Sequence, residues 1–160
     1  MRISDPTLSP ATPGRLWLGA ALWVAATAAQ AQFTMVPAPA TSGPPPASAA
    51  TTDRAYRADG ARHLYATYPT RIHRGKLPPL LYSVLVVETT IDAAGQVQHV
   101  NVLRRPAAPE VAPWVVAMTR RAAPFPVPAA LPGGRVRYFE IWLVDKSGLF
   151  QVDTLTEGQL

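Results

Sequence analysis

Cysteine is absent from all 160 residues of this chain. Without thiols the protein has no disulfide framework, no thiolate zinc site and no cysteine nucleophile. Lysine and glutamate are missing from residues 1–52, which are rich in proline. Such a stretch has little to bury and does not build a globular core. Residues 53–160 carry nearly all the charge and most of the aromatic residues, so we expect one domain of roughly 100 residues there.

Acidic residues are outnumbered, and the formal net charge is +5. A basic domain attracts nucleic acid, anionic lipid or an acidic protein. The arginines are spread along the chain, and aromatic and basic residues do not interleave as they do in a platform that stacks bases. We therefore expect no nucleic-acid partner, and a surplus of charge that keeps the surface soluble.

A long apolar segment is also absent. The run from Leu16 to Ala29 has 14 residues, whereas a membrane-spanning helix needs about 20. Arg2 and Arg15 precede the run, and residues 29–31 read Ala-Gln-Ala, a pattern that signal peptidase accepts. The pattern predicts a cleaved signal peptide over residues 1–31 and an exported protein. The alternative is an uncleaved anchor, which would tie the chain to a membrane.

Residues 32–57 form the next segment, rich in proline and alanine. Proline fixes φ and removes hydrogen-bond donors, so we expect a disordered, extended linker. The domain is then predicted to span residues 58–160.

The domain alternates helical and strand patterns. We expect a short helix capped by Asp59, followed by a second helical turn that Pro69 opens and Gly75 ends. Residues 80–91 are apolar on both faces at their start, which indicates a central strand. A turn at 92–95 leads into a second strand, whose broken alternation predicts a β-bulge near Gln98 and His99.

A longer helix is expected over residues 110–122, because apolar residues recur there at helical spacing: Val111, Trp114, Val115, Met118 and Ala122. Strands are predicted at 135–144 and 149–155. The order is helix, β, β, helix, β, β. We expect an α+β fold, with an antiparallel sheet of three to four strands and one long helix packed on one face.

Five pieces of this pattern recur in a known order. They are Tyr68-Pro69, the strand and turn at residues 90–97, the Val-x-Val strand at 100–102, the Ala-Pro-Phe-Pro segment at 123–126 and a closing strand at 138–144. In this combination the chain resembles the C-terminal domain of TonB-type energy transducers over residues 64–152.

The resemblance implies a periplasmic domain that binds an extended peptide from an envelope protein, such as a segment of an outer-membrane receptor, along a sheet edge. The matching positions are Tyr68 and Pro69. The last strand is the edge that we expect to bind, with Phe150 and Val152 in it and Trp142 as an aromatic anchor. We expect a soluble binding module. The alternatives are a membrane-anchored energy transducer and a homodimer that pairs edge to edge.

Catalytic patterns are missing. The three histidines have no metal-ligand spacing with one another, and neither serine of the domain lies in a nucleophile motif. Glu88 and Glu140 form a carboxylate pair that could do acid–base chemistry if the two faced each other across neighbouring strands. We expect them instead to be solvated surface carboxylates. We expect no enzyme activity, no cofactor and no metal.

Overall fold

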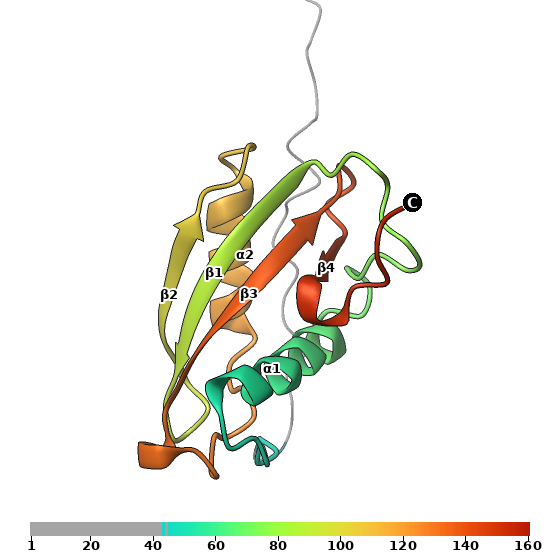
Figure 1. Ribbon diagram of the computed structural model, residues 1–160. Coiled ribbons are helices and arrows are strands. Elements are labelled where there is room, and N and C mark those ends of the chain that lie inside the picture. Colours follow the sequence, from blue (N-terminus) through green and yellow to red (C-terminus); the bar gives the residue numbers. More distant parts are fainter. Residues whose placement is uncertain (1–42, 44) are drawn as a thin grey trace, which may run out of the picture.

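The structure, a computed structural model, describes residue 43 and residues 45–160 (Figure 1). The predicted signal peptide lies outside these residues, and so do residues 32–42 and 44 of the predicted linker. The elements in chain order are α1 (Asp53–Thr67), β1 (Ser83–Ile91), β2 (Val97–Arg104), α2 (Val111–Arg121), η2 (Pro132–Gly134), β3 (Val136–Val144), β4 (Phe150–Val152) and η3 (Asp153–Leu155).

The four strands form one antiparallel sheet in the order β2-β1-β3-β4. β1 is central, as its apolar start indicated, and every second residue from Ser83 to Ile91 is buried. In Figure 1, α2 runs behind β1 and β2, and α1 lies beside β3 and β4. The predicted α+β class with an antiparallel sheet is confirmed. The single long helix is not confirmed, because two helices pack on the sheet and α1 is the longer one.

The second strand carries the predicted bulge. The register between β1 and β2 shifts where Thr90 lies opposite His99 and Ile91 lies opposite Val97, which leaves Gln98 as the extra residue. Another shift leaves Leu103 extra further along β2. The turn predicted before β2 is also present. The side chain of Asp92 accepts hydrogen bonds there from the main-chain N–H groups of Ala94 and Gln96.

The first helix begins earlier than expected. Thr52 is its N-cap and accepts a hydrogen bond from the N–H of Ala55, so the prediction of a cap at Asp59 is wrong. The predicted boundary between linker and domain, between residues 57 and 58, falls inside this helix. Gly60 lies within α1 and faces the ring of Tyr138 on β3, so the helix comes close to the sheet.

The helical turn predicted from Pro69 to Gly75 does not form. Residues 68–71 make a turn, and Ile72 then forms a parallel bridge with Phe150 of β4. The main-chain groups of this segment therefore bind a neighbouring strand, whereas those of a helix would bind one another.

The core lies between the sheet and both helices. The stripe predicted on α2 is buried at Val111, Trp114, Val115 and Met118. The ring of Phe150 has its centroid 4.5 Å from that of Trp142 on β3, 6.2 Å from that of Trp114 on α2 and 6.4 Å from that of Tyr65 on α1. This aromatic contact joins β4 to three other elements. Burying each large apolar side chain contributes on the order of 2 kcal/mol.

Candidate strand-binding edge

The edge of β4 was the predicted binding edge, and it is already paired. The N–H of Phe150 donates to the main-chain O of Arg71 at 2.9 Å, and the N–H of His73 donates to the O of Phe150 at 3.0 Å. The buried side chain of Gln151 adds hydrogen bonds to the carbonyls of His73 and Gly75. Residues 71–75 thus seal this edge, so the prediction of an open edge at β4 is wrong.

The predicted binding side chains are mostly core residues. Tyr68, Trp142, Phe150 and Val152 are each no more than 2 % exposed, whereas Pro69 is exposed in the turn after α1. The hydroxyl of Tyr68 donates to the main-chain O of Met118 at 2.8 Å and so joins the end of α1 to α2. These buried side chains cannot contact a guest without unpacking the core, which corrects their assignment as surface anchors.

The carboxylate pair is separated by the sheet. Glu88 lies opposite Phe139 and Glu140 lies opposite Val87, so the two carboxylates point to opposite faces. Glu140 is buried and accepts hydrogen bonds from Arg57 at 2.9 Å and from the hydroxyl of Thr154 at 2.8 Å. Its role is to hold α1 and η3 against β3.

His63 has structural contacts. His63 on α1 donates from Nε2 to the main-chain O of Ala122 at 2.6 Å, and its ring packs on Phe125. Burial lowers the pKa of His63, although the hydrogen bond to Ala122 acts in the opposite direction. In the part of the chain that the structure describes, no group of three or more His, Asp or Glu residues could hold a metal ion.

Most of β3 has no strand on its outer side. β3 has nine residues, but β4 covers only Trp142, Leu143 and Val144. The N–H of Ile141 points away from β1, because it donates to the carboxylate of Glu140. Main-chain groups alternate in direction along a strand, so those of Arg137 and Phe139 point the same way. Neither has a backbone partner there among the described residues.

A groove follows this unpaired stretch. It has a volume of about 390 Å³ and lies between the first turns of α1 and β3; its lining is Asp53, Arg54, Arg57, Arg137, Tyr138 and Phe139. Phe139 is 48 % exposed. Burial, together with the nearby Tyr56 and Glu140, raises the pKa of Tyr138, so its phenol stays protonated. The groove therefore offers free main-chain groups, an exposed aromatic ring and three guanidinium groups.

The edge of β2 is open but irregular. By the same alternation, the main-chain groups of Val100 and Val102 point away from β1. The bulges at Gln98 and Leu103 interrupt the strand on both sides of these residues. Bulges are one way in which proteins protect an edge, because a guest cannot keep its register across them. β3, by contrast, keeps one register against β1 from Val136 to Val144.

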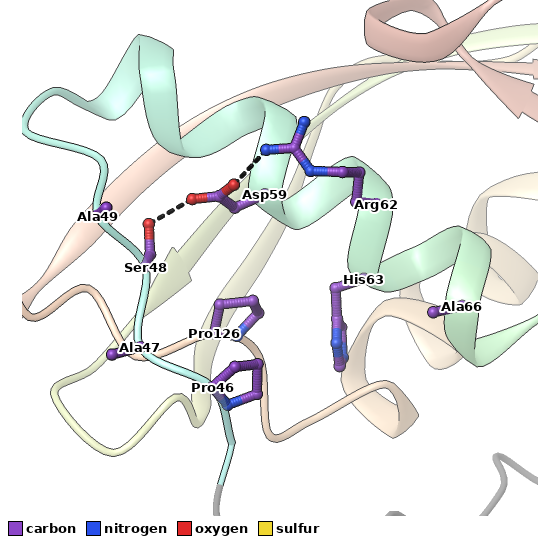
Figure 2. Close-up of a pocket in the computed structure, with 9 residues that line it drawn as sticks. All are labelled: Pro46, Ala47, Ser48, Ala49, Asp59, Arg62, His63, Ala66 and Pro126. Atoms are coloured by element: carbon purple, nitrogen blue, oxygen red, sulfur yellow. Dashed lines mark hydrogen bonds and ion pairs between the residues drawn. The ribbon is translucent and has the colours of Figure 1, made fainter.

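A second hollow lies where the chain enters the domain. Figure 2 shows residues 46–49 crossing near α1 and Pro126, around a pocket of about 490 Å³. The N–H of Ser48 donates to the main-chain O of Val127, and the hydroxyl of Ser48 donates to Asp59, which also pairs with Arg62. The carboxylate of Asp59 is thus already engaged by Ser48 and Arg62, and the other residues that line the pocket are largely proline and alanine.

Comparison of the chain with models of protein families, with curated proteins and with solved structures finds no match. Among the described residues, no helix combines the length and the apolar character needed to cross a bilayer.

Proposed function

We propose that the domain is a periplasmic, TonB-like binding module that takes an extended segment of an envelope protein as an additional strand along β3. One observation carries this proposal: the main-chain groups of Arg137 and Phe139 face a groove and have no backbone partner among the described residues. In strand addition, main-chain hydrogen bonds supply affinity and the side chains of the guest select the partner.

Three further features support the choice of β3. Its register against β1 is regular, so it is a straight template for a guest. Its groove lies within the range of volumes that ligand sites have. The exposed ring of Phe139 supplies an anchor of the kind that interfaces favour. The assignment as TonB-like rests on the order of sequence motifs from Tyr68-Pro69 to the closing strand.

The binding proposal is tested by selecting partners and then locating them. A random library of seven-residue peptides is displayed on phage and selected against the protein. Amide hydrogen exchange is then measured with and without the selected peptide. We expect the amides of Arg137 and Phe139 to exchange fast in the free protein and to become protected in the complex. The amides of Val100 and Val102 on β2 are the matched control and should stay unprotected.

Two outcomes would contradict strand addition at β3. One is a library that yields no binder. The other is a binder that protects Val100 and Val102 and leaves Arg137 unprotected, since this would place the guest on β2.

The proposed location has its own test. Mass spectrometry of the protein purified from its native envelope should find Gln32 as the first residue, since the pattern at 29–31 predicts cleavage after Ala31. A mature chain that keeps residues 16–31 would instead support the alternative, a membrane-anchored energy transducer.

A further inference from the structure

Basic side chains surround the open half of β3. The groove beside it is lined by Arg54, Arg57 and Arg137. A second depression of about 460 Å³ shares Arg137 with this groove and adds Arg135 and His99. It also contains Thr90 and Pro132, so it extends over the start of β3 and onto the outer face of the sheet. The two depressions form one basic region at the end of β3 that lies away from β4.

Part of this positive charge has no close carboxylate partner in the described chain. Arg57 is committed, because it pairs with Glu140 at 2.9 Å and with Asp153 at 3.1 Å. Arg137 is 67 % exposed and reaches Glu88 only at 4.0 Å.

Neither Arg54 nor Arg135 forms an ion pair within 4.0 Å in the described chain. Arg135 does lie near enough to Asp92 to help lower the pKa of that carboxyl group. Asp53 is the only carboxylate among the residues that line the two depressions.

The geometry of β3 decides which part of a guest meets these charges. β4 and η3 occupy the side of β3 from Trp142 onward, and the carboxylate of Glu140 binds Thr154 of η3 there. A guest strand must therefore end near Glu140 and extend from there toward the N-terminal end of β3, past Arg137. One of its ends then lies beside Arg135 and His99. Positive groups at that end attract carboxylates and repel a basic segment.

We infer that the partner segment is acidic, with carboxylate side chains at the end that passes Arg137 toward Arg135, and with aliphatic residues where it crosses Phe139. This inference rests on the proposed strand addition and names the chemical class of its guest. The charges act mainly through the outer depression, where Arg135 and Arg137 are exposed. Their contribution should therefore depend on ionic strength, because exposed charges are screened by salt.

The test uses three synthetic peptides with the same central alternation of threonine and valine. One has two glutamates at each end, one has glutamines there and one has lysines, so the result does not depend on the direction in which the peptide binds. Dissociation constants for the full chain are measured by fluorescence anisotropy at low and high salt. We expect the glutamate peptide to bind about tenfold tighter than the glutamine peptide at low salt, and the difference to shrink at high salt.

A charge-reversed protein supplies the second arm. Arg135→Glu combined with Arg137→Glu should reverse the preference, so that the lysine peptide binds best. The matched control, Arg104→Glu with Arg105→Glu, makes the same change in net charge at the C-terminal end of β2. It should leave the preference as it is in the unaltered protein. The salt dependence of the unaltered protein keeps the test valid if a variant fails to fold.

The outcomes separate the two proposals. Equal binding of the glutamate and glutamine peptides at low salt would overturn the acidic partner and leave strand addition standing. Binding of none of the three peptides would count against strand addition itself, and the inference would fall with it. A preference that also reverses in the control variant would show that net charge matters and the position of the arginines does not.

Discussion

Adding one methyl group at Gly60 tests how closely α1 approaches the sheet. An ideal Cβ at this position would lie 2.8 Å from the hydroxyl oxygen of Tyr138 and 2.9 Å from the ring carbon that carries it. Real side chains do not approach so closely, so either the ring or the helix must move. Tyr138 is 3 % exposed and its ring also packs on Tyr56, which leaves it little freedom.

Two opposing effects set the size of the change in Gly60→Ala. Alanine is favoured over glycine inside a helix by about 1 kcal/mol. Inserting a methyl group into a packed core costs typically 1–3 kcal/mol, and the contact with Tyr138 puts this site in the upper part of that range. We therefore expect a net loss of about 1–2 kcal/mol in the free energy of unfolding. For a domain of this size each kcal/mol lowers Tm by about 4–8 °C.

Urea denaturation followed by circular dichroism measures this loss. Ala66→Gly, at an exposed position of the same helix, is the control for helix propensity and should cost about 1 kcal/mol. Combining Gly60→Ala with Tyr138→Phe removes the closest contact, so the double variant should lose less stability than the two single variants add up to. A Gly60→Ala protein that is more stable than the unaltered one would refute the close approach.

Three further variants test other contacts. Arg57→Ala removes the ion-pair partner of the buried carboxylate of Glu140 and should lower the free energy of unfolding, measured by urea denaturation, by about 2 kcal/mol. Arg54 has no such ion pair, so Arg54→Ala should change the free energy of unfolding by no more than about 0.5 kcal/mol. Equal losses in the two variants would contradict this role of Arg57. Because burial lowers the pKa of His63 in the folded state, the unfolded chain takes up the proton first, and stability should fall as the pH drops below about 6.5. His63→Gln should weaken this dependence between pH 7 and pH 5, and an unchanged slope would assign it to other groups. Tyr68→Phe loses one buried hydrogen bond, about 1 kcal/mol, and should bind a selected peptide as tightly as the unaltered protein; weaker binding in the same anisotropy assay would restore Tyr68 to the site.

The elements that the sequence predicted well have strong local patterns. The alternation in β1, the turn at Asp92 and the apolar stripe of α2 all lie within short windows, where a period of 2 or 3.6 residues is visible. The bulge at Gln98 was predictable for the same reason, because it breaks the alternation of valines in β2. Such features depend on neighbours in the chain more than on distant contacts.

The length of the first helix was underestimated because the residues on its buried face do not form an apolar stripe. Gly60 and Ala61 are buried beside Tyr56 and Leu64, and two of these four residues are too small to mark a hydrophobic stripe. Their burial follows from how closely α1 lies against β3, which is a property of the assembled fold. The cap at Thr52 lies in a segment whose prolines and alanines indicated a linker.

The prediction of an open edge at β4 was wrong because the availability of an edge is a long-range property. Phe150 is paired by Arg71 and His73, which lie more than 70 residues earlier in the chain. No pattern within the last strand reveals that partner. The short length of β4, and hence the unpaired half of β3, depends in turn on η3 starting at Asp153. A sequence signal for the open stretch of β3 is Arg137-Tyr138-Phe139. A basic residue and an aromatic residue lie two positions apart there, and so on the same exposed face of the strand.

The arginines around β3 also bear on how an open edge avoids pairing with a second copy of the chain. Unpaired strands invite pairing with a second copy, and charged side chains are a common protection against it. If two copies paired along β3, the arginines that line both edges would approach one another, which costs free energy in a partly desolvated interface. An acidic guest meets the opposite situation. If strand addition occurs as proposed, the same charges would disfavour a homodimer that pairs through this edge and favour an acidic partner, so protection against self-pairing and selectivity for the guest would have one physical cause.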